Sequence, residues 1–392
     1  MQRARGVHTS TPMRLALLMN LAPRKLGSFE GWLTALAAEA ERRGHELDVY
    51  GRLPVHPEVA QALARSGAGF APLEELGAAP LAAARRLGNY DIIRLDFLQP
   101  RSRHALIAYA AWPARVLFSA HSDSPRGARP RLRGLLSRAA DRATFARVDS
   151  LAAVSEHVRE QFRARFGLDR PRTRVLYNGV DASRFRPATG ARPPSAELTF
   201  VSVAHLVTHK GIDVLLRAFA RVPAPVRLRV VGDGPELAAL DALARSLRIS
   251  PRVEFLGLRD DVPELLRSAD AYVHPTFVEG FGNAVAEAMS SGVAVIASRV
   301  GGIPEVVEAG VSGLLVPPGD EDALAAAMTR VAADPELRAR LGEHARRRVL
   351  ARFTVEASVA GHLDWCEERA ALSPRGRRQT AAPRIAAVVS RR

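Results

Sequence analysis

Two glutamates eight residues apart, Glu279 and Glu287, bound the glycine-rich stretch EGFGNAVAE. An apolar run ends just before this stretch. Its second half predicts the start of a helix that carries Asn283 and Glu287 on one face. Carboxylates accept hydrogen bonds from paired sugar or ribose hydroxyls, and the amides of residues 280–282 would lie at the positive end of that helix. The pattern favours a sugar- and phosphate-binding site, although two solvated glutamates would give the same letters.

A second candidate anion site lies in the segment AHLVTHKGID, where a predicted strand ends and a predicted helix begins at about Gly211. His205 and Lys210 lie in the loop between them. Helix-start amides together with an ammonium group bind phosphate. Of the 56 basic residues only Lys25 and Lys210 are lysines. Because arginine is used at almost every other basic position, the lysine at 210 indicates a specific role and not an ordinary surface cation.

Two further glycine turns follow predicted strands. The turn GDGPE holds Gly232 and Gly234 but lacks the third glycine of a dinucleotide fingerprint, because Leu237 stands there. Taken alone it is interpreted as structural. The turn GGIPE, which begins at Gly301, adds another set of amides. In the first half, His121 follows a predicted strand and is either a solvated loop histidine or a candidate for sugar contact or proton transfer.

Metal-binding patterns are absent from the sequence. The acidic run Asp320-Glu321-Asp322 precedes a helical pattern, so capping and the helix dipole explain it better than metal binding does. No HExxH, CxxC, EF-hand or GxxxxGK[ST] spacing occurs. We therefore predict no metal and no bound cofactor.

The elements that must position these residues alternate between strand and helix. Apolar runs of strand length predict buried strands at 13–20, 47–50, 91–95, 116–120, 150–155 and 173–176, and a second series begins at 198–204. A Pro-, Gly- and Ala-rich segment at 186–197 predicts a linker between the two series. The alternation predicts an α/β fold with two doubly wound parallel sheets, in which ligands bind beyond the carboxyl ends of the strands.

Composition agrees with two soluble domains. The chain has 392 residues, of which 47% are hydrophobic and 25% charged. No run reaches the roughly 18 apolar residues that a membrane span needs. The single cysteine, Cys366, excludes an intrachain disulfide framework. The first twelve residues lack the apolar stretch of a secretory signal. These features predict a cytoplasmic protein.

The formal net charge of +15 is unevenly distributed. Residues 1–183 carry 28 basic and 17 acidic side chains, and residues 101–147 hold ten arginines against two aspartates. Such a stretch favours an anionic partner or an anionic membrane surface, or it is a solvated surface shaped by arginine bias. A nucleic-acid-binding protein remains an alternative, although no nucleic-acid-binding module is visible.

Several of these motifs, taken together in order, resemble the retaining glycosyltransferases of family 4, across residues 13–372. In family order they are NGVD from Asn178, KG-x-x-x-LL-x-A from Lys210, GDGPE, the two spaced glutamates, GG-x-PE and GLLVPPGD. The resemblance implies the GT-B fold, with two Rossmann-like doubly wound parallel-sheet domains facing across a cleft. It implies an acceptor-binding domain at 13–185, a nucleotide-sugar-binding domain at 196–353, a helix at 354–372 crossing back to the first domain, and a basic disordered tail at 373–392.

The resemblance also implies residue roles. Lys210 would neutralise the donor's diphosphate, Glu287 would hold the ribose hydroxyls, and Glu279 would hold the transferred sugar. A departing nucleoside diphosphate gains negative charge, so fixed cations and amides would stabilise the transition state. The residues assigned to catalysis are His121, Lys210 and Glu279. Those assigned to donor binding are Gly27, Ser28, His205, Lys210, Gly232, Glu279, Gly280, Phe281, Gly282, Asn283 and Glu287.

Three positions depart from the family's pattern. His205 stands where the family usually has the arginine of a G-R-L, and Gly27-Ser28 stands where it has two glycines. Arg94 and Asp96 occupy a strand in which many members have histidines. The departures at the donor loops point to a weaker or unusual phosphate clamp.

The sequence therefore predicts a metal-independent, retaining glycosyltransferase that moves a hexose-type sugar from a nucleoside-diphosphate sugar to an anionic or lipid-linked acceptor. It would be cytoplasmic or peripheral at the inner membrane face. The alternatives are a GT-B sugar phosphorylase, a nucleotide-sugar epimerase and a catalytically silent sugar-binding relative. A phosphate requirement would identify the first, and donor interconversion without an acceptor the second.

Overall fold

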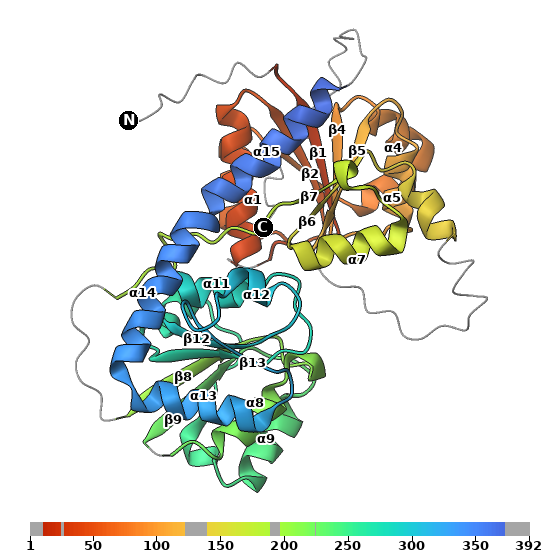
Figure 1. The fold of residues 1–392 in the computed structure, drawn as a ribbon. Helices are drawn as coiled ribbons and strands as arrows, with labels where there is room; N and C mark the ends of the chain where they lie inside the picture. The colour runs from red at the N-terminus through yellow and green to blue at the C-terminus, as the bar shows by residue number, and fades with distance from the viewer. Residues whose placement is uncertain (1–10, 25–26, 122–138, 189–196, 224, 373–392) are drawn as a thin grey trace. The chain divides into compact units, whose positions relative to one another are not determined.

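A computed structural model describes residues 11–24, 27–121, 139–188, 197–223 and 225–372 (Figure 1). Contacts divide the chain into two compact units. Unit 1 comprises the chain up to Val154, residues 159–176 and the chain from Ser358, whereas unit 2 comprises residues 155–158 and 177–357. The predicted tail at 373–392 and much of the arginine-rich stretch, at 122–138, lie outside the described residues.

Unit 1 contains a seven-stranded parallel sheet in the order β3-β2-β1-β4-β5-β6-β7. The strands are β1 (Arg14–Met19), β2 (Glu46–Gly51), β3 (Gly69–Pro72), β4 (Ile92–Asp96), β5 (Arg115–Ala120), β6 (Ser150–Ala153) and β7 (Thr173–Val175). Nearly all of their residues are buried, because a parallel sheet has helices on both faces. The predicted parallel architecture is confirmed for this half of the chain, with β3 as an additional strand.

The described helices of unit 1 include α1 (Ser28–Arg42), α2 (Pro57–Arg65), α3 (Glu74–Ala78), α4 (Pro80–Leu87), α5 (Arg103–Tyr109), α7 (Glu156–Phe166) and α15 (Val355–Ala371). Residues 139–145 are also helical. The first turns of α7 and α15 are counted with unit 2. Helix α1 ends just before Gly44. Gly44 has a left-handed φ of 76°, and its N–H donates to the carbonyl of Glu41 over 2.8 Å.

The first turn of α7 is fixed by a carboxylate of unit 2. Glu305 accepts hydrogen bonds from the backbone N–H groups of Glu156 (2.8 Å) and His157 (3.0 Å). The hydroxyl of Tyr177 also donates to Glu305, over 3.1 Å. An acid that caps the positive end of a helix is stabilising. The glutamate of the GGIPE turn therefore has a structural role.

Unit 2 contains a six-stranded parallel sheet in the order β10-β9-β8-β11-β12-β13. The strands are β8 (Leu198–Val203), β9 (Val226–Val231), β10 (Val253–Phe255), β11 (Ala271–His274), β12 (Ala294–Ser298) and β13 (Leu314–Val316). The helices are α8 (Ile212–Phe219), α9 (Leu237–Ser246), α10 (Val262–Arg267), α11 (Asn283–Ser290), α12 (Ile303–Val306), α13 (Glu321–Ala333) and α14 (Pro335–Arg352). The second predicted parallel α/β domain is confirmed.

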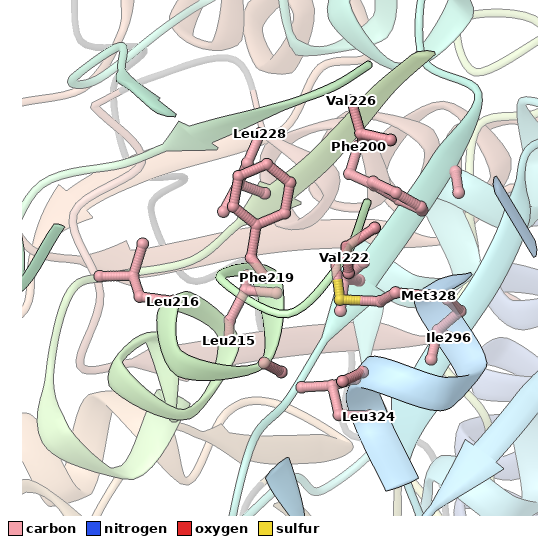
Figure 2. Close-up of a cluster of buried hydrophobic side chains, with 14 of the residues drawn as sticks. Phe200, Leu215, Leu216, Phe219, Val222, Val226, Leu228, Ile296, Leu324 and Met328 are labelled. Carbon is pink, nitrogen blue, oxygen red and sulfur yellow. The ribbon is translucent and has the colours of Figure 1, made fainter. Parts of the chain in front are cut away.

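The core of unit 2 forms where α8 and α13 pack on the sheet. Figure 2 shows Leu215 and Phe219 of α8 near Phe200 and Leu228 of the strands, and Met328 of α13 beside them. All five are at most 1% exposed. The i, i+3, i+4, i+7 spacing that predicts this helix therefore marks its buried face. The core fixes the direction in which α8 leaves the loop that precedes it.

Two predictions about helix ends concern chemistry. The carboxylate of Asp320 accepts a hydrogen bond from the N–H of Ala323 over 2.8 Å, at the start of α13. This confirms capping as the explanation of the acidic run.

Helix α15 lies beside α1 in Figure 1, and the ring centres of His362 and Trp32 are 5.2 Å apart. Within the described residues, no helix has both the length and the apolar content needed to cross a bilayer.

Candidate active site

The predicted site residues of unit 2 follow neighbouring strands. Lys210 comes after β8, Gly232 after β9, Glu279 after β11 and Gly301 after β12. These strands are parallel, so their carboxyl ends lie at one edge of the sheet. The loops after β8 and β11 are joined directly, because the N–H of Phe277 donates to the carbonyl of His209 over 2.8 Å. The topology thus brings the motifs together.

Glu279 is held by two side chains at one oxygen. Its Oε2 lies 2.8 Å from Nζ of Lys210 and 3.1 Å from Nε2 of His274. Burial opposes charge on this carboxyl, but His274 and Lys210 outweigh burial and lower the pKa of Glu279 to about 2. The glutamate is therefore anionic near neutral pH, and the ammonium of Lys210 is fixed in place before any ligand arrives.

His274 is a site residue that the sequence analysis does not identify. It is the last residue of β11 and only 3% exposed. Its Nδ1 lies 3.2 Å from the hydroxyl of Tyr272, and burial raises the pKa of that tyrosine far above its usual value. A histidine inside an apolar strand run, five residues before a glutamate, is the signal that could have found it.

Two glycines let these loops approach closely. At Gly232 (φ 132°), a Cβ would lie 1.8 Å from the carbonyl oxygen of Ala204. At Gly301 (φ 53°), a Cβ would lie 1.8 Å from the carbonyl oxygen of Glu279, which also accepts a hydrogen bond from Gly302 N–H over 3.0 Å. Gly232 therefore packs against the loop of His205, and the Gly301 turn supports the backbone of Glu279.

The stretch from 280 to 287 has mixed roles. Phe281 is 2% exposed, and its ring lies 5.6 Å from that of Phe353, so only its backbone is available to a ligand. Gly282 has a left-handed φ of 99° and precedes α11. Asn283 begins α11 and accepts a hydrogen bond from the Asn178 side chain over 2.9 Å. Glu287 lies on the same helix, half-buried.

His205 is exposed and its orientation is defined. Its Nδ1 lies 2.6 Å from the backbone carbonyl of Asp233 and therefore donates its hydrogen there. This leaves Nε2 as the outward atom, which can donate to a phosphate only when the ring is protonated. The neighbouring His209 has its pKa lowered by burial, by Lys210 and by His205, so the cationic groups of this loop lie close together.

Replacing His205 with arginine is expected to tighten nucleoside-diphosphate binding by about tenfold, because a guanidinium is charged at every working pH and donates two hydrogen bonds to a phosphate. Calorimetric titration measures the affinity of the wild type and of His205→Arg. Ala326→Arg, on the exposed face of α13, controls for added charge. Equal or weaker binding by His205→Arg would contradict a phosphate-facing His205.

In unit 1, the predicted site residues lie at the start of helix α1 and at the end of strand β5. Gly27 precedes α1 and Ser28 begins it, and the Gly27 N–H donates to the carboxylate of Glu30 over 3.1 Å. This amide is therefore used in capping the helix. His121 follows β5, and its Nε2 lies 2.8 Å from Oδ1 of Asp96 at the end of β4. Asp96 appears in the sequence analysis only as a departure from the family pattern.

A pocket of about 510 Å³ lies beside the loop after β8 in unit 2, between α8 and α9. Its lining includes Val207, Thr208 and Glu236 but neither Lys210 nor Glu279, so the pocket adjoins the candidate site without containing its charged centre. In the part of the chain that the structure describes, no three histidine, cysteine, aspartate or glutamate side chains gather as metal ligands.

Comparison with known proteins identifies the family. The model of the family "Glycosyltransferase Family 4" matches residues 30–184, and that of "Glycosyl transferases group 1" matches residues 190–348. A GDP-mannose-dependent alpha-(1-6)-phosphatidylinositol monomannoside mannosyltransferase of Mycolicibacterium smegmatis is 31% identical, over 84% of this chain and 91% of its own. An N-acetyl-alpha-D-glucosaminyl L-malate synthase of Bacillus anthracis is 29% identical, over 74% and 78%.

Solved structures show the same architecture. The Anabaena protein HepE, in complex with UDP and glucose, matches with a TM-score of 0.73 and 24% identity over 91% of this chain and 100% of its own. A sucrose-phosphate synthase of Thermosynechococcus elongatus matches with a TM-score of 0.72 and 23% identity, over 92% and 100%. The fold is therefore GT-B. The chain belongs to glycosyltransferase family 4, and the protein is a glycosyltransferase.

Proposed function

We propose that the protein transfers a hexose-type sugar from a nucleoside-diphosphate sugar to an acceptor, with retention of anomeric configuration and without a metal ion. The observation that carries this proposal is the Lys210–Glu279 pair, fixed at 2.8 Å at the carboxyl edge of the second sheet. It supplies a preorganised cation where a diphosphate would develop charge.

The proposed step breaks the bond between the sugar's anomeric carbon and the diphosphate oxygen, and forms a bond from that carbon to an acceptor hydroxyl oxygen. The proton of the acceptor hydroxyl passes to the departing diphosphate oxygen or to solvent, and the diphosphate leaves with the electron pair of the broken bond. Lys210 and the amides of 280–282 stabilise the negative charge of the leaving diphosphate. Glu279 holds the sugar through its hydroxyls, and Glu287 holds those of the ribose.

The comparisons support a nucleotide-linked donor without selecting its base. The mycobacterial relative is named as GDP-mannose-dependent, whereas HepE was crystallised with UDP. We assign acceptor binding to unit 1, whose sequence holds the arginine-rich stretch at 101–147. This charge favours an anionic acceptor or one presented at an anionic membrane surface, which the cytoplasmic face of a membrane provides.

A binding screen tests the donor site. UDP-, GDP-, ADP- and dTDP-glucose, with GDP-mannose and UDP-N-acetylglucosamine, are added to the protein in EDTA and the shift in Tm is measured. One base series is expected to stabilise the protein, by about 2.7 kcal/mol at a ligand concentration 100 times Kd. Lys210→Ala is expected to lose the shift. Arg347→Ala, which removes an exposed cation from α14 of the same unit, is expected to keep it.

Binding without a metal and loss of binding in Lys210→Ala would support the proposal. No shift with any donor in a folded wild type would overturn the donor site. A shift that requires Mg²⁺ would overturn metal independence alone. Retention is tested by the anomeric configuration of the product, read by the one-bond C–H coupling in NMR, and an inverted anomer would contradict it.

A further inference from the structure

The central strand β4 of unit 1 buries an ion pair. Arg94 and Asp96 are both 0% exposed, in a strand whose other residues are apolar. Removing two charges from water is costly, and an apolar pair of similar volume is often as stable or more stable. Stability of the sheet alone therefore does not explain why these two residues stand here.

Contacts from the arginine keep the aspartate anionic. Nη2 of Arg94 donates to Oδ1 of Asp96 over 2.8 Å, and Nε donates to the Ser119 hydroxyl over 3.0 Å. The guanidinium lies 4.8 Å from the ring centre of Trp32. Burial opposes charge on Asp96, but the Arg94 charge and the His121 hydrogen bond outweigh it and hold the pKa of Asp96 well below its usual range.

His121 is held along one edge and over one face. Its Nε2 lies 2.8 Å from Oδ1 of Asp96, and its ring stacks on Phe97 at a centroid distance of 3.9 Å and an interplanar angle of 15°. Phe97 follows Asp96 directly and has φ 53°, a left-handed conformation that is costly for an aromatic residue. The end of β4 thus supplies both contacts that orient the imidazole.

The direction of the hydrogen bond to Asp96 determines which nitrogen of the His121 ring can accept a hydrogen bond. An ionised carboxylate only accepts hydrogen bonds, so Nε2 of His121 must carry the hydrogen that Asp96 receives. Nδ1 has no hydrogen-bond partner among the described residues, and the side chain is 13% exposed. In the neutral ring Nδ1 is therefore a directed acceptor for one hydroxyl group.

We propose that Asp96, itself fixed by Arg94, is a positioning residue for His121, and that it presents Nδ1 of the neutral imidazole as the acceptor for a sugar hydroxyl during transfer. This inference rests on the proposed sugar-transfer function. His362 adds no charge near this group. Its ring is buried, with its centre 5.2 Å from that of Trp32, and burial together with the Arg94 charge holds its pKa well below the usual value, so it stays neutral. Among the described residues, Asp96 is the charged group in contact with His121, and Arg94 is paired with Asp96.

The test measures the kcat and KM of the wild type and of Asp96→Asn. We expect kcat to fall by about 10- to 100-fold, as for other residues that orient a functional histidine, and the donor KM to change less than threefold. In a His121→Ala background, Asp96→Asn is expected to have no further effect on kcat.

Two further variants separate positioning from folding. Arg94→Met combined with Asp96→Asn removes the whole ion pair, so no buried charge is left unpaired, and it is expected to lower kcat as Asp96→Asn does. Asp48→Asn removes another buried carboxylate of the same sheet, bonded to the Tyr90 hydroxyl at 2.6 Å. It is expected to lower Tm without the loss of kcat that Asp96→Asn causes.

An Asp96→Asn enzyme with wild-type kcat would overturn the positioning role. So would equal effects of Asp96→Asn in the wild-type and His121→Ala backgrounds. Donor binding, measured by the Tm shift, depends on unit 2 and is expected to survive in all of these variants. A wild type that neither binds nor turns over any nucleotide sugar would instead overturn the proposed function, and the two failures are therefore distinguishable.

Discussion

Replacing Glu279 with glutamine is expected to lower the kcat/KM of sugar transfer by about 10²–10³. The carboxylate receives Lys210 and His274 at a single oxygen, over 2.8 and 3.1 Å. A neutral amide has one carbonyl oxygen and no charge, so it cannot hold an ammonium group in the same place. We expect the Lys210 side chain to lose its fixed position and the donor's diphosphate to lose a directed cation.

Steady-state kinetics with the donor identified by the binding screen measure this effect. Glu264→Gln is the matched control, because Glu264 lies on α10 of the same unit with a side chain that is 58% exposed. Its activity is expected to stay within twofold of the wild type. A Glu279→Gln enzyme within threefold of the wild type, with an unchanged Tm, would show that the Lys210–Glu279 pair does not act in the reaction.

Substituting alanine at Gly301 is expected to destabilise unit 2 by about 3 kcal/mol or more and to abolish measurable transfer. The new Cβ would lie 1.8 Å from the carbonyl oxygen of Glu279, and the position has φ 53°. The loops must move apart to relieve the clash. A displacement of about 1 Å at a positioned group costs on the order of 10²-fold in rate.

Gly310→Ala separates crowding from backbone strain. Gly310 has a similar left-handed φ of 77°, but a Cβ there would meet nothing within 4 Å. It is expected to cost about 1 kcal/mol and to leave activity intact. Urea unfolding and a transfer assay measure both variants. Equal losses of stability at the two glycines would show that the close approach to Glu279 contributes nothing beyond the backbone conformation.

Much of the fold could be predicted because each buried strand is a short apolar run between helical patterns. The buried face of α8 follows from the local spacing of Ile212, Leu215, Leu216 and Phe219. Strand β3 could not be predicted in this way, since its four residues GFAP include Gly69 and Pro72 and have no apolar run of their own. It forms because β2 offers a free edge, with Val49 opposite Phe70.

The site was predictable only in part. The proximity of Lys210 and Glu279 follows from parallel strands, whose ends share an edge, and the structure places the two side chains in contact. The contact of Asp96 with His121 depends on register instead, because β4 and β5 pair with Asp96 opposite Ser119, two residues before the histidine. No local pattern encodes that register. The burial of the Phe281 side chain could not be predicted either, because the glycine-rich loop has no periodic pattern that separates buried from exposed positions.

The path of the chain between the units limits how the protein can be recombined. Unit 2 includes residues 155–158 as well as 177–357, and Glu305 caps the start of α7 within it. A chimera joined at the predicted linker and a transplant of residues 177–357 both replace residue 305, and both keep the cap where the incoming chain has the glutamate of the GGIPE turn. On the proposed function, the transplant of 177–357 would exchange donor preference between family members, with two junctions instead of one.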